Sequence, residues 1–223
     1  MNLEDINSVI EHSEMQIKEL AGSIEKNKIN KVLLKNTLEN LRSILDYLAV
    51  DMSSYLNDSK EKLYFPYGRK ENHFKLSVKR NLPELRQKSE ELYEVLEKRQ
   101  PFKSKKSWLI DLCELTNEAK HNNLNKTSKS TTTGLRVGNL LHVEDVSNVK
   151  ISASNNYVNG KRCDDFEMDK GVITSINPGE INLEFTSNEK IRFQGKEIEI
   201  ISFLETTKDE LIDLKKEVYN LIS

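Results

Sequence analysis

The stretch from Leu34 to Tyr55, LKNTLENLRSILDYLAVDMSSY, carries the clearest structural pattern in this chain. Its apolar residues recur at alternating steps of three and four, which places their side chains on one face of an α-helix. That face is formed by Leu34, Leu38, Leu41, Leu45, Leu48, Met52 and Tyr55. A stripe of about six turns needs other helices to cover it, so the sequence predicts a helical bundle around this segment.

Three further segments have the pattern of helices that cover such a stripe. Residues 3–24 repeat leucine and isoleucine at helical spacing. A third helix is expected from Pro83 to the residues before Pro101, because proline suits the first turn of a helix and disfavours a helical residue directly before it. A fourth helix is expected at about residues 104–123. These segments together predict a four-helix bundle over residues 1–125.

A long connection is expected between the second and third helices. It contains the sequence YFPYG at residues 64–68, where a proline and a glycine interrupt the helical pattern. The aromatic side chains of Tyr64, Phe65 and Tyr67 are expected to pack on the bundle. The alternative is that they stack on bases in a nucleic-acid groove.

The composition changes after residue 125. Residues 126–134, KTSKSTTTG, are polar and are expected to form a linker. Beyond them, the runs NVKISAS, GVITSI, EINLEF and EIEIISFL nearly alternate apolar with polar residues, which predicts a small antiparallel β module at 135–206. Residues 207–223 predict an amphipathic C-terminal helix that docks on the sheet or returns to the bundle. The expected fold class is α+β.

Composition narrows the classes of function. The 223 residues include 34 basic and 36 acidic ones, so no overall positive field attracts nucleic acid, and any contact with RNA must use a local patch. No apolar run approaches the roughly 18–20 residues that span a bilayer, and we expect a soluble, cytoplasmic protein without membrane contact. Cys113 and Cys163 lie far apart and outside any Cys/His cluster, so no metal site, disulfide or cofactor is expected.

The fourth helix ends in LTNEAKHNNL, where polar side chains follow an apolar helix. On a helical wheel Asn117 and Lys120 fall at the apolar flank, and His121 falls at its boundary. Burying such groups costs on the order of a few kcal/mol each unless they find partners. Arg42 and Asp46, one turn apart in the second helix, flank its apolar stripe and offer such partners. The sequence therefore predicts that these five side chains cluster where the second and fourth helices meet.

The sequence also resembles a group of bacterial proteins whose helical domain is similar to the HEPN superfamily. The resemblance rests on LRSILDYLAVDM, YFPYG, RQPF and SWLIDLCELTNEAKHNNL in this order, and it covers roughly residues 30–125. In that group the motif Leu-Arg-x-x-Leu-Asp-Tyr on one helix is paired with Asn-x-x-Lys-His on another, and a β-rich part follows. The resemblance implies a HEPN-like four-helix bundle and a homodimer.

HEPN ribonucleases cleave RNA without a metal ion. The resemblance implies that His121 assists attack of the 2′-hydroxyl on the adjacent phosphodiester, while an arginine stabilises the developing negative charge. The family places that arginine four to six residues before the histidine. This chain departs from the pattern, because the positions four to seven residues before His121 hold asparagine, threonine, leucine and glutamate. Arg42 or Lys120 would have to supply the positive charge.

Three functions are compatible with these patterns. The first is an RNA-binding protein or metal-independent endoribonuclease of the toxin–antitoxin or phage-defence type, with the catalytic set His121, Arg42, Lys120, Asn117 and Asp46. The second is a non-catalytic interaction or scaffold protein, in which the polar cluster fixes the register of the helices. The third is a helical subunit that needs a protein partner to be stable.

Overall fold

The computed structural model describes residues 1–25, 29–57, 63–120, 127–137, 141–143, 146, 149–170, 172–181, 183–193 and 198–222. The chain is α+β and divides into two compact units, which we call the helical unit and the β unit. The helical unit consists of Met1–Thr127 together with Ile198–Ser223, and the β unit consists of Ser128–Glu197. In chain order, the β unit is therefore an insertion between two parts of the helical unit.

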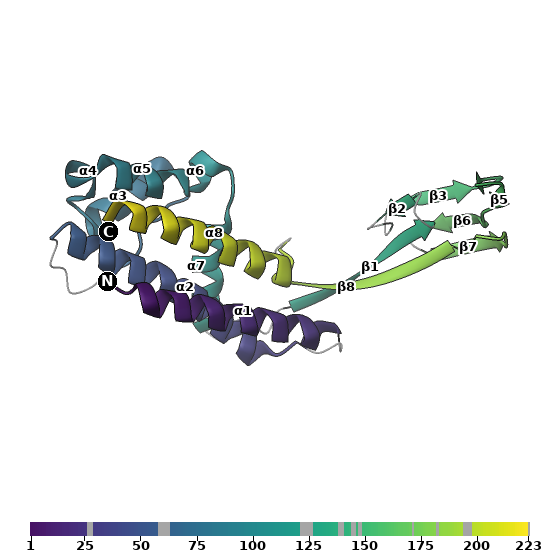
Figure 1. Cartoon of the computed structure of the whole chain (residues 1–223), viewed down its shortest axis with the longest axis horizontal. Coiled ribbons are helices and arrows are strands. Elements are labelled where there is room, and N and C mark those ends of the chain that lie inside the picture. Colours follow the sequence, from purple (N-terminus) through teal and green to yellow (C-terminus); the bar gives the residue numbers. More distant parts are fainter. Residues whose placement is uncertain are drawn as a thin grey trace. The chain divides into compact units, whose positions relative to one another are not determined.

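All the helices of the described residues belong to the helical unit (Figure 1). They are α1 (Leu3–Glu25), α2 (Lys31–Tyr55), α3 (Glu71–Asn81), α4 (Leu85–Lys88), α5 (Glu90–Lys98), α6 (Pro101–Ser104), α7 (Trp108–Lys120) and α8 (Ile200–Ile222). The predicted helices over 3–24 and 34–55 are confirmed as α1 and α2. None of these described helices is both long enough and apolar enough to cross a membrane.

Helix α2 forms the centre of the helical unit. The members of its predicted stripe from Leu34 to Met52 have no exposed surface, and only Tyr55 at the end is exposed. Helices α1, α7 and α8 all pack against α2. Burying one leucine side chain contributes about 1.5–3 kcal/mol, so this stripe is a main source of stability for the unit.

The C-terminal helix α8 returns to the bundle, and it packs on α1, α2, α5 and α7 (Figure 1). Its fully buried apolar residues are Ile200, Leu204, Leu211, Leu214 and Val218. A polar contact adds to this packing. The buried carboxylate of Asp51 in α2 accepts hydrogen bonds from the backbone nitrogen (2.7 Å) and Nδ2 (2.9 Å) of Asn2 and from the hydroxyl of Tyr219. One carboxylate thus ties the beginning of α1 and the end of α8 to α2.

The predicted third helix was wrong in two respects. Helix α3 lies where a long connection was expected, and the helix expected from Pro83 is broken into α4 and α5. Ser89 separates these two helices. Its backbone is extended, and its Oγ accepts a hydrogen bond from the backbone nitrogen of Leu92 at 3.2 Å, so it caps α5 instead of continuing α4.

The predicted fourth helix begins later than expected. Residues 101–104 form the separate short helix α6, which ends because Lys105 takes a left-handed conformation with a φ of 58°. The long helix α7 then starts at Trp108 and is described up to Lys120. The remainder of the predicted helix, residues 121–123, lies outside the described residues.

The β unit contains two strands of 11 residues and six shorter ones in its described part. They are β1 (Thr127–Val137), β2 (Leu141–Val143), β3 (Lys150–Ala153), β4 (Tyr157–Val158), β5 (Lys161–Arg162), β6 (Asp165–Asp169), β7 (Val172–Asn177) and β8 (Leu183–Phe193). Strands β2 with β1, β3 with β6, β4 with β5 and β6 with β7 pair in antiparallel fashion. The strand orders are β2-β1-β8, β3-β6-β7 and β4-β5. In the second sheet Phe166 is the partner of Ala153 and of Ile176. Phe166, Met168 and Val146 form a small buried core.

Two predictions at the borders of the β unit were wrong. The expected polar linker is largely strand β1, because its many β-branched threonines favour extended backbone and β8 is a hydrogen-bonded neighbour of this strand. The expected strand EIEIISFL contains the beginning of α8. Glu199 caps that helix, since its carboxylate accepts hydrogen bonds from the backbone nitrogens of Ile201 (3.0 Å) and Ser202 (2.7 Å).

Candidate functional site

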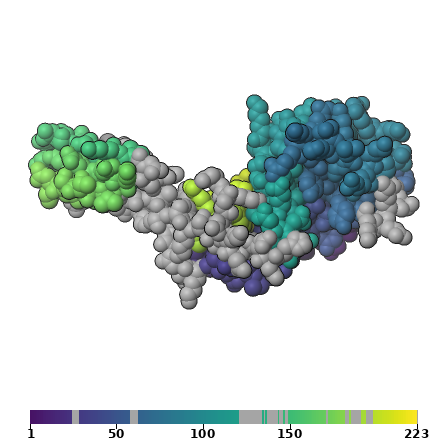
Figure 2. Space-filling view, turned by 180° about the vertical axis from the view of Figure 1, so that it is seen from behind, coloured from purple at the N-terminus to yellow at the C-terminus, as the bar shows by residue number. Residues whose placement is uncertain are grey.

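A cavity of about 730 Å³ opens in the helical unit between α2, α3, α7 and the segment 63–68. Typical ligand pockets measure about 300–1,000 Å³. The basic side chains of Arg42, Arg80 and Lys120 line it, together with the carboxylate of Asp46. In Figure 2 the teal surface around α7 adjoins the blue surface of the residues that precede it. Because basic groups outnumber acidic ones on this wall, the cavity favours a negatively charged ligand.

Four of the five residues predicted to cluster line this cavity. They are Arg42 and Asp46 from α2, and Asn117 and Lys120 from α7. Helices α2 and α7 pack against each other, and residues one turn apart on each helix share a face. His121 lies outside the described residues. The four described residues thus line one cavity at the junction of the two helices, but the prediction that Asn117 and Lys120 are buried was wrong, because both are exposed.

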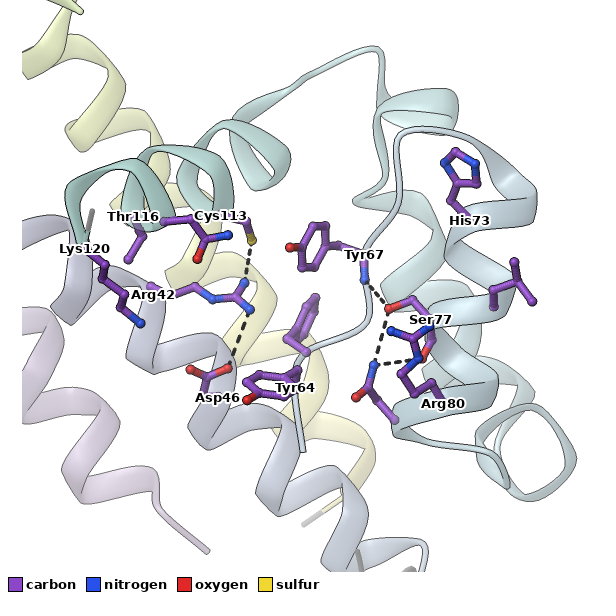
Figure 3. A pocket seen from close by; sticks show the side chains of 14 residues that line it. Arg42, Asp46, Tyr64, Tyr67, His73, Ser77, Arg80, Cys113, Thr116 and Lys120 are labelled. Atoms are coloured by element: carbon purple, nitrogen blue, oxygen red, sulfur yellow. Dashed lines mark hydrogen bonds and ion pairs between the residues drawn. The ribbon is translucent and has the colours of Figure 1, made fainter. Parts of the chain in front are cut away.

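Arg42 is held by three neighbours (Figure 3). Its Nη1 donates a hydrogen bond to Sγ of Cys113, and its Nη2 lies 3.8 Å from Oδ1 of Asp46. Its Cζ lies 5.3 Å from the centre of the Tyr67 ring, which is within the range of a cation–π interaction. Only 13% of the Arg42 side chain is exposed. These contacts fix the direction of the guanidinium before any ligand arrives.

Asp46 places a carboxylate among the basic groups of the cavity. Burial raises the pKa of Asp46 above the ordinary aspartate value, although the charges of Arg42 and Lys120 act in the opposite direction. Its Oδ1 is buried and accepts no hydrogen bond within the described part of the chain, since 3.8 Å from Arg42 is too long for one. When ionised, Asp46 repels an anion that enters the same cavity.

Cys113 and Tyr67 are neutral at physiological pH. Burial raises the pKa of Cys113 to about 12, although the positive charge of Arg42 lowers it. Burial is also the main cause of the raised pKa of Tyr67. A thiol acts as a nucleophile only in its ionised form, so Cys113 is suited to support Arg42 and not to attack a substrate.

Helix α3 forms a wall of the cavity that the sequence analysis missed. Its lining residues are spaced alternately three residues and one residue apart, which places them on one face of the helix: His73, Leu76, Ser77, Arg80 and Asn81. A signal for this helix is present in the sequence, because Phe74, Val78 and Leu82 recur every four residues and are buried. Three apolar residues in a charged segment directly after a proline and a glycine make this signal weak.

The segment 63–68 is tied to α3 and to Gln100, the residue before α6. The backbone nitrogen of Tyr67 donates a hydrogen bond to Oγ of Ser77 at 3.3 Å, and that of Gly68 donates to Oε1 of Gln100 at 3.0 Å. Gln100 is fully buried. Phe65 packs in the core as predicted, whereas 56% of Tyr64 is exposed. The segment thus forms a fixed part of the cavity wall.

Comparisons with known proteins do not assign this cavity. No protein-family model, no curated protein and no solved structure matches the chain. Within the described ranges, no three His, Cys, Asp or Glu side chains come together in the way a metal site requires. The residues of the cavity are therefore the basis for a functional proposal.

Proposed function

We propose that the helical unit is HEPN-like, binds RNA in this cavity and acts as a metal-independent endoribonuclease of the toxin or phage-defence type. One observation carries the proposal: Arg42, Arg80 and Lys120 line the same cavity as Tyr64 and Tyr67. Basic side chains bind phosphate groups and aromatic rings stack on bases, so this set suits a nucleic-acid strand better than a simple anion. The order of the motifs along residues 30–125 supports the same proposal.

The cations have different parts in binding. Arg42 is held in place by Cys113, Asp46 and Tyr67, so it offers a planar donor whose direction is already set. Lys120 is exposed at the end of α7, and it offers a flexible charge that can follow the phosphate backbone. Together they are suited to hold one phosphodiester at the junction of α2 and α7.

The proposed cleavage needs no co-reactant. The 2′-oxygen attacks the adjacent phosphorus while its proton passes to a base, the bond from phosphorus to the 5′-oxygen breaks, and the 5′-oxygen takes up a proton. We assign the acid–base role to His121 from the Asn-x-x-Lys-His pattern. Arg42 or Lys120 stabilises the charge that develops on the phosphate oxygens, and the amide of Asn117 lines the same cavity.

Replacing Lys120 with alanine is expected to weaken RNA binding about 10-fold, because one phosphate contact is lost. The unfolding temperature should stay within about 1–2 °C of the wild type, since exposed side chains contribute little to stability. Fluorescence polarisation of a labelled RNA strand in EDTA measures the affinity. Lys79→Ala is the matched control, because Lys79 is an exposed lysine of α3 that does not line the cavity. Equal weakening by both substitutions would count against the proposal.

The burial of Arg42 favours a second interpretation. A guanidinium that is 13% exposed and has three partners is also suited to fix the register of α2 against α7. The chain would then be a non-catalytic interaction or scaffold protein. In that case Arg42→Ala lowers the free energy of unfolding by about 1–3 kcal/mol, and the wild type binds no RNA. Binding of RNA by the wild type decides between the two interpretations.

RNA affinity is expected to rise as the pH falls through the raised pKa of Asp46. Protonation removes the negative charge that repels the phosphate, and because burial raises the pKa of Asp46, the change occurs at a higher pH than for an ordinary aspartate. Asp46→Asn should bind RNA about 3- to 10-fold more tightly than the wild type at pH 7. The two proteins should converge in affinity at low pH. Titrating both proteins downward from pH 7 separates the effect of Asp46 from the effects of all groups that the two proteins share; curves that stay parallel would contradict the assignment.

A further inference from the structure

The cavity has basic side chains on two separate walls, with the segment 63–68 between them. Arg42 and Lys120 come from α2 and α7, whereas Arg80 comes from α3. Tyr67 joins the two walls, because its ring lies over Arg42 and its backbone nitrogen donates a hydrogen bond to Ser77, three residues before Arg80. Figure 3 shows the two tyrosines between Arg42 and the α3 residues. A ligand that contacts both walls must carry at least two negative groups and pass the tyrosines.

The middle of the cavity offers apolar surface to its ligand. Tyr64 is 56% exposed and Leu76, from the opposite wall, is 61% exposed, and both line the cavity. The ring of Tyr67 is already occupied by Arg42. Phe65, next to Tyr64, is fully buried and anchors the segment. The Tyr64 ring is therefore presented to the cavity and is suited to stack on a flat group.

We infer that the cavity takes single-stranded RNA, with one unpaired base against Tyr64 and Leu76 and the flanking phosphates on Arg42 with Lys120 and on Arg80. The inference rests on the proposed function and specifies its substrate. A base in a duplex is covered by its neighbours and cannot reach a side chain inside a cavity unless it leaves the stack, whereas an unpaired base stacks on an aromatic ring without that cost. A cavity of about 730 Å³ holds a nucleotide but not a double helix.

The test uses the full chain and 12-nucleotide RNA with 2′-O-methyl groups, which cannot be cleaved. Three probes are compared by fluorescence polarisation: the single strand, the same strand annealed to its complement, and a strand that has the sugar–phosphate backbone without bases. The single strand is expected to bind at least 10-fold more tightly than the duplex. Tyr64→Ala should weaken binding of the single strand about 5- to 30-fold and leave the base-free strand unchanged, while Tyr64→Phe should keep the wild-type affinity.

The Arg80 contact has its own readout. Log affinity falls as log salt concentration rises. Arg80→Ala should make this negative slope shallower by about 0.7, and the matched variant Lys79→Ala should leave the slope unchanged. Equal affinity for duplex and single strand, or equal loss of both single-stranded probes in Tyr64→Ala, would overturn the inference. If either outcome is found but Lys120→Ala still weakens RNA binding, the inference fails and the proposed function stands. If no probe binds at all, the proposed function fails and the inference fails with it.

Discussion

Replacing His121 with alanine is expected to slow EDTA-resistant RNA cleavage by about 100- to 10,000-fold, the usual effect of losing a positioned acid or base. The role that we propose for His121 rests on the Asn-x-x-Lys-His pattern, and Asn117 and Lys120 of that pattern line the cavity. The rate is measured with a fluorophore–quencher RNA in EDTA, and the unfolding temperature of each variant is measured beside it. A fall in rate without a fall in unfolding temperature marks a loss of chemistry.

A second histidine provides the control for this experiment. His12 lies on α1, is exposed and does not line the cavity, so His12→Ala should cleave RNA at the wild-type rate. A folded His121→Ala variant that cleaves as fast as His12→Ala would remove His121 from the mechanism. RNA binding by the wild type without any cleavage would reduce the proposed function to binding alone.

Replacing Gly68 with alanine is expected to lower the free energy of unfolding by about 3 kcal/mol or more and to abolish RNA binding. A Cβ at this position would lie 2.3 Å from the backbone nitrogen of Phe74 and 2.8 Å from the carbonyl carbon of His73. Backbone atoms cannot turn aside as a flexible side chain can. Relief therefore requires α3 to move or the hydrogen bond from Gly68 to Gln100 to break. Either change separates the α3 wall from the segment 63–68.

Gly22→Ala is the control for Gly68→Ala, because Gly22 is a helical glycine with open space around it. A Cβ there meets nothing within 4 Å, so Gly22→Ala should stabilise the protein by about 0.5–1 kcal/mol through helix propensity. Thermal unfolding of both variants measures the difference, and 3 kcal/mol corresponds to roughly 6–12 °C for a chain of this size. A Gly68→Ala variant as stable as the wild type would contradict the close approach of α3.

The helices with long apolar stripes were predictable from the sequence. The apolar repeat of α2 is uninterrupted from Leu34 to Met52. Because every member of this repeat is buried, the helix turns this one face towards the core. The Arg42 and Asp46 pair could be placed beside this stripe for the same reason. Asn117 and Lys120 followed from the wheel of the next strong helix. This part of the candidate site depends on local spacing, which a sequence displays directly.

The α3 side of the site depends on contacts between distant residues, and so it was not predictable. Phe74 is buried against the rings of Tyr93 and Phe102, with centroids 5.5 and 6.1 Å away. Those rings come from α5 and α6. The segment carries few apolar residues of its own, and packing against these rings holds it in place. Arg80 reaches the cavity only as a result of that packing.

The errors at EIEIISFL and KTSKSTTTG have a common physical cause. A short alternation such as EIEI fits a strand, yet Ile200 also begins the buried stripe of α8, and the longer stripe buries more surface. In the other direction, a polar run rich in threonine has no apolar pattern to mark it as a strand. It becomes one because neighbouring strands satisfy its backbone.

The insertion of the β unit between α7 and α8 sets the order of events during protein synthesis. Helices α1, α2, α5 and α7 leave the ribosome before α8, although each of them packs on α8 in the folded unit. At roughly 5–20 residues per second, translation spends about 4–14 s on the inserted residues 128–197 before α8 is made. The helical unit therefore completes its fold only after residues 198–222 have emerged. The helices α2 and α7, which border the cavity, gain their packing partner α8 only after the whole β unit has been made.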